Sequence, residues 1–328
     1  MKSENPPTDE REKTEKKDKI RKYLKGWVKD ILVSFAVVGV IIGALYGYSG
    51  LWPFLVVVES GSMQHGTDSQ IGVIDTGDMV LVKKVNSQGE LTTYIKGKIM
   101  GYTTYGAFGD VVVYRKNGHE ESTPVIHRIV LFLKYNSSSN SFDIPELNDP
   151  ALVPGKDWGV VGSTPRWYAL NGKLWIANYG HAHINLTVNL GGILSNPPSR
   201  HDGYITLGDN NRGSIDQTNL LYRDELVQPV KFEWIVGVAR GELPWFGALK
   251  LIFTGNAQAV PGNSWLFLEI SIALIIVIPF LVDYFIEISK KKREKIKGKS
   301  KAVVVCPRCN AENDLKERKC KNCGEKLK

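Results

Sequence analysis

Two long apolar runs interrupt an otherwise polar chain. The first occupies residues 31–52, and the second occupies residues 264–286, where the stretch 270–282 carries no charge. About 20 apolar residues in a helix are enough to cross the hydrocarbon layer of a bilayer. The pattern therefore predicts one transmembrane helix on each side of a long middle segment, residues 53–263.

Each apolar run has a competing interpretation. A cleaved signal peptide has a shorter apolar core that ends at small residues, whereas the first run is long and begins only at residue 31. We therefore interpret it as a permanent anchor. The second run also fits a buried core helix, but the basic string KKKREKIKGKSK follows it. Because Lys and Arg are retained on the cytoplasmic side of a span, this string favours a membrane helix.

Basic residues next to the two runs predict the orientation of the chain. Lys22, Lys25 and Lys29 precede the first run, and residues 290–293 follow the second. We therefore expect both termini in the cytoplasm and the middle segment on the extracytoplasmic side of the cell membrane. The net charge of +8 then reflects membrane orientation, and we predict no nucleic-acid partner.

The polar segments outside the spans are expected to have little tertiary structure. Residues 1–30 are predicted to form a cytosolic basic tail, disordered at first and helical at about 18–30. Residues 287–301 are predicted to form a basic linker.

The middle segment carries short runs of β-branched and aromatic residues between Gly, Asn and Asp, which is the pattern of short strands. These runs are 54–58, 79–85, 110–115, 125–133, 204–209 and 232–241. We predict a mainly β, mainly antiparallel domain. Residues 134–200 differ, because they begin with NSSSNS and contain three Trp residues. They are expected to form an insertion with its own small aromatic core.

A candidate nucleophile follows the first predicted strand, in the string VVVESGSMQHG. Ser62 in this string has flexible neighbours that could present its hydroxyl on a tight turn. A serine hydroxyl is a weak nucleophile and needs a base within hydrogen-bond distance. The string S-G-S is also ordinary loop composition, so it decides nothing alone.

Histidines and aspartates elsewhere supply candidate partners for this serine. His127 lies in the aliphatic strand VIHRIV, where a base would be held rigidly, although a buried structural histidine fits the same pattern. His65 is a second candidate base, three residues after Ser62 on a loop. A carboxylate can hold the base in the required tautomer, and Asp209 or Asp216 in LGDNNRGSID could serve. Asp209 also suits an Asx turn.

The order of five strings along the chain resembles that of type I signal peptidases. They are S-G-S-M, G-D at 109–110, I-H-R, G-D-N-N…D at 208–216, and V-G-x-A-R-G at 236–241. The resemblance is to the archaeal and endoplasmic-reticulum branch, which uses His as the base. It covers the first apolar run and most of the middle segment, apart from residues 134–200.

This resemblance implies a role for each matching residue. Ser62 would be the nucleophile and His127 its base, and the two family aspartates would be Asp209 and Asp216. We expect Asp216 to orient the base. Ser60 would supply a hydroxyl to the oxyanion hole, together with the backbone N–H of Ser62.

The resemblance also implies a fold and a substrate. The fold would be a signal-peptidase-like antiparallel β-domain at the membrane surface, and the substrate a signal peptide with small residues at the first and third positions before the cut. The apolar stretch 243–253 would suit contact with the bilayer near the cleft. Two departures stand out. The family normally has a Pro where this chain has His65, and its His branch separates the two aspartates by six residues rather than the seven between Asp209 and Asp216.

All four cysteines lie near the C-terminus, so the middle segment is not a disulfide-stapled domain. Cys306, Cys309, Cys320 and Cys323 form two C-x-x-C pairs. Four thiolates at this spacing suit tetrahedral Zn²⁺ better than a redox pair. We predict a structural zinc ribbon at 302–328 and no cofactor for catalysis. The ribbon would be a docking site for a translocon, a ribosome or another protein.

The leading interpretation is a membrane-bound serine endopeptidase that removes signal peptides from exported preproteins. A non-catalytic membrane receptor built on a degenerate peptidase domain is one alternative. A processing protease acting on other secreted pro-proteins is another.

Overall fold

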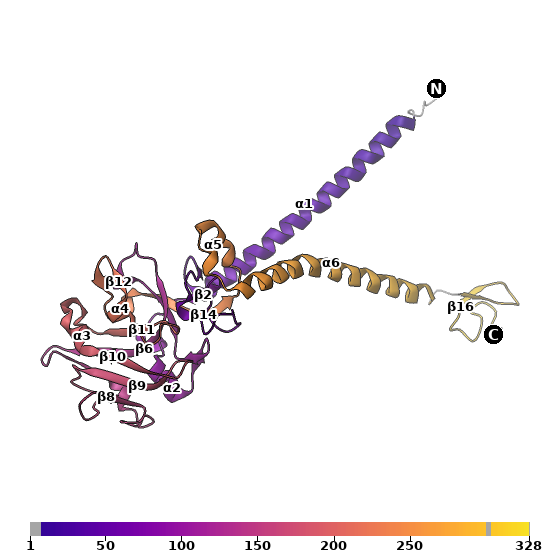
Figure 1. The fold of residues 1–328 in the computed structure, drawn as a ribbon. Coiled ribbons are helices and arrows are strands. Elements are labelled where there is room, and N and C mark those ends of the chain that lie inside the picture. Colours follow the sequence, from indigo (N-terminus) through magenta and orange to yellow (C-terminus); the bar gives the residue numbers. More distant parts are fainter. Residues whose placement is uncertain (1–7, 300–302, 328) are drawn as a thin grey trace. The chain divides into compact units, whose positions relative to one another are not determined.

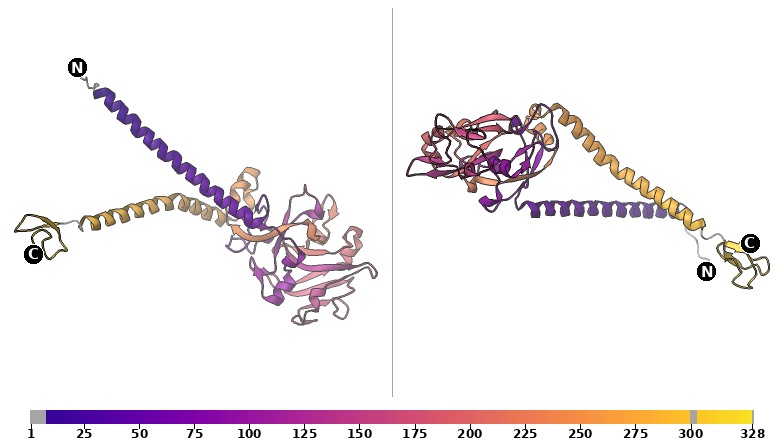
Figure 2. Two further views of the ribbon diagram at one scale, coloured as in Figure 1. Left: turned by 180° about the vertical axis from the view of Figure 1, so that it is seen from behind. Right: turned by 90° about the horizontal axis from the view of Figure 1, so that it is seen from below.

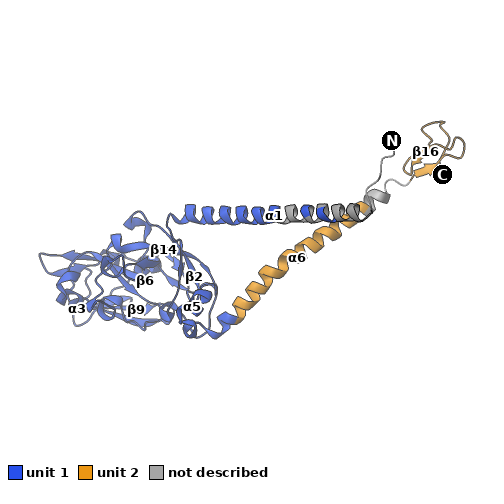
Figure 3. Cartoon of the chain, turned by 90° about the horizontal axis from the view of Figure 1, so that it is seen from above, with its two compact units in different colours: residues 1–265 blue, residues 266–328 orange. Residues whose placement is uncertain are grey.

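The structure is a computed structural model of the 328-residue chain and describes residues 8–299 and 303–327. The chain divides into two compact units, residues 1–265 and residues 266–328 (Figure 3). The described part of the first unit contains a long N-terminal helix and all the strands of a β-domain. The second contains most of another long helix and a small cysteine-containing hairpin.

Two long helices are apolar enough to cross a membrane. Helix α1 is Thr8–Ser49 and helix α6 is Gly262–Lys299, and both are visible along their length in Figure 2. The stretches long and apolar enough to span are Val28–Ser49 and Gly262–Glu294. Both predicted spans are therefore found as helices. Pro279 lies inside α6, as membrane helices tolerate.

Both helices extend further into polar sequence than predicted. Helix α1 begins at Thr8 rather than near residue 18, so the expectation of a disordered tail is wrong from Thr8 onward; residues 1–7 lie outside the described residues. Helix α6 continues through the predicted linker as far as Lys299, and residues 300–301 lie outside the description. Once a helix is nucleated, each added residue costs little, and the Lys and Glu of these flanks are good helix formers.

The main sheet of the β-domain has seven strands, and all of its pairings are antiparallel. The strand order is β1-β2-β14-β5-β6-β11, and β7 pairs with β6. The strands are β1 Leu55–Val57, β2 Met79–Lys83, β5 Val111–Tyr114, β6 Val125–Asn136, β7 Ser141–Asp143, β11 Gly203–Leu207 and β14 Ile235–Leu243. All six predicted strand runs lie in this sheet, which confirms the mainly antiparallel β prediction.

A second sheet is formed within the predicted insertion. Its strands are β8 Trp158–Val160, β9 Lys173–Tyr179 and β10 Ile184–Asn189, in the order β10-β9-β8, followed by α3 Leu190–Ser195. Figure 1 shows these elements on the side of the β-domain away from β2 and β14. The remaining helices and short strands are α2 Tyr94–Met100, β3 Thr103–Thr104, β4 Ala107–Phe108, α4 Asp216–Asn219, β12 Leu221–Tyr222, β13 Glu225–Leu226, α5 Ala248–Thr254, β15 Val303–Val305 and β16 Glu312–Asp314.

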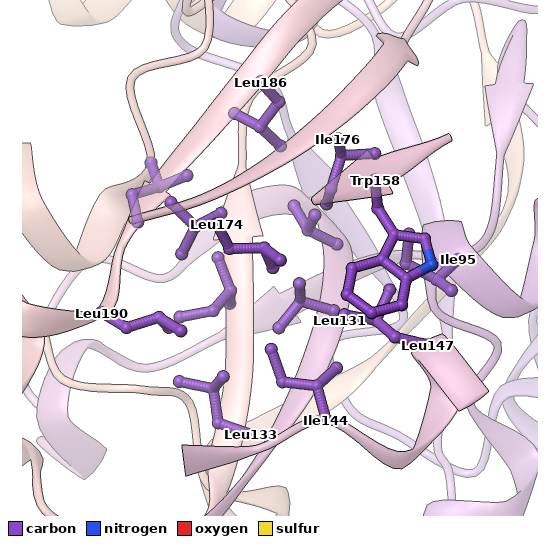
Figure 4. Close-up of a cluster of buried hydrophobic side chains, with 14 of the residues drawn as sticks. Ile95, Leu131, Leu133, Ile144, Leu147, Trp158, Leu174, Ile176, Leu186 and Leu190 are labelled. Atoms are coloured by element: carbon purple, nitrogen blue, oxygen red, sulfur yellow. The ribbon is translucent and has the colours of Figure 1, made fainter. Parts of the chain in front are cut away.

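The insertion does not have the separate aromatic core that the sequence suggested. Its buried side chains join one cluster with residues of the main sheet and α2. In Figure 4, Trp158, Leu174 and Ile176 of the second sheet face Leu131 of β6 and Ile95 of α2. The reason is physical: a three-stranded sheet with one apolar face must bury that face against another layer, and the main sheet provides it.

Candidate functional site

The predicted nucleophile lies on a short turn after β1. Ser62 is the middle residue of a 3₁₀ turn, Gly61–Met63, and Met63 is buried beneath it. The loop after β11 holds this turn in place. The backbone N–H of Asn210 donates to the Ser62 carbonyl at 2.8 Å, and its side-chain amide donates to the Gly61 carbonyl at 2.9 Å. The backbone that carries Ser62 is therefore held in place by hydrogen bonds from Asn210.

The predicted base lies within hydrogen-bond distance of this serine. His127 is on β6, where it is paired with Val112 of β5, and it is 5 % exposed. Its Nε2 is 2.9 Å from the Ser62 hydroxyl oxygen. A neutral imidazole that is unprotonated at Nε2 accepts the Ser62 hydrogen in this arrangement. The structure thus brings together two residues that are 65 positions apart in the sequence.

Asp216 holds the other side of the imidazole. This buried residue begins α4, and its two carboxylate oxygens lie 2.7 and 2.9 Å from His127 Nδ1. Tyr114 and Thr206 donate to the same carboxylate, at 2.7 and 2.6 Å. Burial, followed by the charge of Asp216, raises the pKa of Tyr114 well above its ordinary value, so Tyr114 stays a donor. Asp216 is therefore held rigidly while it accepts the Nδ1 hydrogen.

Asp209, the other predicted carboxylate, serves a different partner. It accepts two hydrogen bonds from the buried guanidinium of Arg128, at 2.8 and 2.6 Å, and lies 3.0 Å from His65 Nε2. Burial alone would raise the pKa of Asp209, but the charge and hydrogen bonds of Arg128, helped by His65, lower it to about 2. Asp209 is thus a charged part of the domain interior. Of the two predicted aspartates, the structure places Asp216 at the base.

Gly208 is required for the close approach of these groups. A Cβ built at this position would lie 2.6 Å from the Ser62 carbonyl oxygen and 2.7 Å from His127 Nε2. Real side chains do not tolerate such distances, so any other residue would push the serine and histidine apart.

The predicted oxyanion-hole residue lies beside the nucleophile. The hydroxyl oxygen of Ser60 is 3.3 Å from that of Ser62. The Ser60 hydroxyl is therefore next to the predicted nucleophile, where a hydrogen-bond donor to the point of attack would be needed. Two donors near a developing alkoxide are the requirement for stabilising a tetrahedral intermediate.

Several residues at this site were missed by the sequence reasoning. Tyr114 and Thr206 lie in ordinary strand sequence and carry no local signal. Arg128 does carry one, because an arginine inside the aliphatic strand VIHRIVLFL must be paired if it is buried. His181 lies in loop sequence and carries no local signal either, but its ring stacks on that of His65, with a centroid distance of 3.8 Å.

The four cysteines form a separate candidate metal site in the second unit. Cys306, Cys309, Cys320 and Cys323 place their sulfur atoms within 4.8 Å of one another, and two of the separations are 3.5 Å. Sulfurs around a tetrahedral zinc lie about 3.8 Å apart if each Zn–S bond is about 2.3 Å. The donor set and its spacing therefore fit a metal ion with four thiolate ligands, as predicted for this hairpin of β15 and β16.

Comparisons of the chain with models of known protein families, with curated proteins and with solved structures find no match.

Proposed function

We propose that this chain is a membrane-anchored serine endopeptidase of the signal peptidase kind. The observation that carries the proposal is the continuous chain of hydrogen bonds from Ser62 through His127 to Asp216, with separations of 2.9 and 2.7 Å. A nucleophile, a base and an orienting carboxylate in this order are the arrangement that acyl-transfer catalysis requires, and this supports the proposal. They come here from three separate elements, which makes a chance arrangement of polar residues a poor explanation.

The reaction follows from the positions of the protons. Ser62 Oγ attacks the scissile carbonyl carbon while its proton passes to His127 Nε2. The imidazolium that forms keeps its Nδ1 hydrogen bonded to the Asp216 carboxylate, which stabilises the positive charge. The carbonyl oxygen becomes an alkoxide, and the Ser60 hydroxyl and the Ser62 N–H donate to it.

The intermediate collapses when His127 returns the proton to the leaving amine. The C–N bond breaks, the new amino terminus departs, and an acyl-enzyme ester remains on Ser62. A water molecule then attacks the ester as His127 takes its proton, and the proton finally returns to Ser62. The net reaction is hydrolysis of one peptide bond.

The proposed substrates are the signal peptides of exported preproteins. Support comes from the order of motifs in the sequence and from the two apolar helices, which would hold enzyme and membrane-embedded substrate in one plane and raise their effective concentration. The segment that precedes the second helix in the sequence adds to this. Leu249, Ile252 and Phe253 of α5 are exposed, Phe253 at 89 %, which suits contact with a bilayer.

The proposed orientation follows the basic flanks of the helices. Lys29 lies at the start of the first span, and Lys290 to Arg293 lie in the last part of α6. With these residues in the cytoplasm, the β-domain is extracytoplasmic and the cysteine cluster is cytosolic. We propose that this cluster is a zinc ribbon whose metal supplies its folding energy, and that it docks to a translocon or a ribosome.

Cleavage by the purified full chain in detergent tests the proposal. The substrate is a preprotein, and the products are identified by mass spectrometry. Ser62→Ala and His127→Ala should each abolish cleavage at the signal-peptide boundary. Ser138→Ala, at an exposed position, and His119→Ala, at a half-buried position, should retain it. Cleavage that survives in either of the first two variants would rule out the mechanism.

Substrate variants separate the proposal from its alternatives. A preprotein with Leu in place of the small residues at the first and third positions before the cut should be cleaved poorly. Equal cleavage of such variants would favour a broader processing protease. If the wild-type chain binds the preprotein but releases no product, the receptor interpretation replaces the enzyme.

A further inference from the structure

His65 lies on the loop that follows the nucleophile. Its side chain contacts three other parts of the domain, at Asp209, His181 and Gly106. It is three residues after Ser62, and its side chain is 9 % exposed. A short exposed loop would ordinarily leave a polar side chain in water. The burial of this ring indicates that it holds the loop against the rest of the domain.

The first partner of His65 is the buried ion pair beneath it. His65 Nε2 lies 3.0 Å from Asp209 Oδ2, and the same oxygen accepts from Arg128 at 2.6 Å. Both Arg128 and Asp209 have fully buried side chains. The carboxylate is therefore a fixed, charged acceptor, and a hydrogen bond to such an acceptor is stronger than one between neutral groups.

The second partner comes from the inserted sheet. His181 lies in the turn between β9 and β10, and its ring is nearly parallel to that of His65, with an interplanar angle of 14° and centroids 3.8 Å apart. Burial, and then the neighbouring His65, lower the pKa of His181 from its ordinary value of 6.5. The His181 ring is therefore uncharged at neutral pH, which permits close stacking.

The third contact of the His65 ring is with the backbone at Gly106, where the absence of a side chain leaves room for the imidazole. Gly106 has a φ of +77°, and a Cβ built there would lie 2.8 Å from His65 Cε1. The imidazole thus sits between the insertion, the loop after β11 and the turn at Gly106.

We propose that His65 is a positioning residue, whose hydrogen bond to Asp209 and stacking on His181 of the insertion fix the loop that carries Ser62. It acts through the backbone of residues 62–65, and the proton of Ser62 goes to His127. The insertion then has a defined role, because it supplies the surface that completes this loop. The proposal rests on the function proposed above and adds the means by which the nucleophile is held.

Steady-state kinetics on the full chain in detergent test the role. His65→Ala should lower kcat by about 10- to 100-fold, the effect expected when a nucleophile is misplaced by about 1 Å, and should leave KM unchanged. His65→Gln should recover most of kcat, because its amide N–H can still donate to Asp209. Glutamine cannot act as a base, so recovery also excludes proton transfer by His65.

The contribution of the insertion is tested by a double-mutant cycle. His181→Ala should reduce kcat less than His65→Ala does, and the double variant should be no slower than His65→Ala alone, because the stacking is already lost. His119→Ala, which changes a half-buried histidine outside this cluster, should behave as wild type. The proposal is overturned if His65→Ala retains the wild-type kcat, if His65→Gln is as slow as His65→Ala, or if the two alanine effects are additive.

Hydrogen–deuterium exchange gives a readout that does not depend on catalysis. Peptides covering residues 60–66 should exchange faster in His65→Ala and in His181→Ala than in wild type, while peptides from β6 should not change. Unchanged exchange at 60–66 would overturn the proposal. If the wild-type chain cleaves no substrate, the proposed function fails, and the exchange result alone then decides the role of His65.

Discussion

Replacing Arg128 by Met tests how the charged interior beneath the site is stabilised. The Arg128 side chain is fully buried and donates to Asp209, to Thr104 and to backbone carbonyls of the 105–109 turn. Met replaces the aliphatic part of the side chain but leaves the Asp209 carboxylate without its charged partner. Removing one member of a buried ion pair costs about 3–5 kcal/mol, because the remaining charge stays buried.

The pKa of Asp209 gives a second estimate of the stability that is lost when Arg128 is replaced. Its fall from 3.8 to about 2 corresponds to about 2 kcal/mol of net stabilisation, at about 1.36 kcal/mol per pKa unit. That value already includes the opposing effect of burial, so the loss of Arg128 should exceed it. For a domain of this size, a loss of about 3–5 kcal/mol corresponds to a fall of about 6–20 °C in Tm.

Tryptophan fluorescence during heating of the detergent-solubilised chain measures this change. Arg128→Met should lower Tm by the amount given, and the double variant Arg128→Met, Asp209→Asn should recover part of it, because no unpaired charge remains. A Tm for Arg128→Met within about 2 °C of wild type, less than 1 kcal/mol, would refute the reasoning. So would a double variant that is no more stable than the single one.

The ion pair of Arg128 and Asp209 also predicts how the stability of the domain depends on pH. Because the folded pKa of Asp209 is lowered, its contribution to stability is present above about pH 4 and is lost as the pH falls through about 2. The difference in Tm between wild type and the double variant should therefore be largest at neutral pH and shrink in acid. A difference that is constant across this range would contradict the assignment of the charge to Asp209.

Four further outcomes are expected from separate parts of the chain. Ser60→Ala should lower kcat by about 100- to 1,000-fold with little change in KM, as for the loss of one oxyanion donor, and Ser60→Thr should recover activity; an unchanged kcat in Ser60→Ala would remove Ser60 from the site. Gly208→Ala should abolish cleavage, because its Cβ would lie 2.7 Å from His127 Nε2, and measurable wild-type activity would show that the site can relax. Cys309→Ser should lose the one zinc ion per chain that elemental analysis is expected to find, while the cleavage rate stays the same; retained zinc would exclude Cys309 as a ligand. Burial raises the pKa of Asp78 from 3.8 to about 7, so the folded state favours the protonated form, and this group should destabilise the domain increasingly as the pH rises from about 4 through about 7; Asp78→Ala should flatten the corresponding fall in Tm, and an unchanged slope would assign the titration to another group.

The strands of the main sheet were predictable because each carries its signal locally. Runs such as DVVVYR and VIHRIVLFL combine β-branched residues with flanking turn residues, and they form β5 and β6. The core of the insertion could not be predicted, because it depends on contacts that sequence spacing does not reveal. Leu174 and Ile176 are buried against a layer contributed by Leu131, more than forty positions away.

Some residues of the candidate site could be predicted from the sequence, and others could not. Ser62, His127 and Asp216 could be proposed from motifs, since each is recognisable by residue type and order. The partners of Asp216 could not, because Tyr114 on β5 and Thr206 on β11 meet only once the order β5-β6-β11 is known. The choice between the two aspartates likewise required the position of Arg128, which turns Asp209 into an internal counter-ion.

Strand β6 carries His127 and Arg128 at adjacent positions, paired with Val112 and Val111 of β5. Successive strand residues point to opposite sides, so a shift of one residue in this pairing would exchange the two. The guanidinium would then replace the imidazole beside Ser62, and Asp209 would lose its counter-ion. A misregistered chain would therefore be both inactive and unstable.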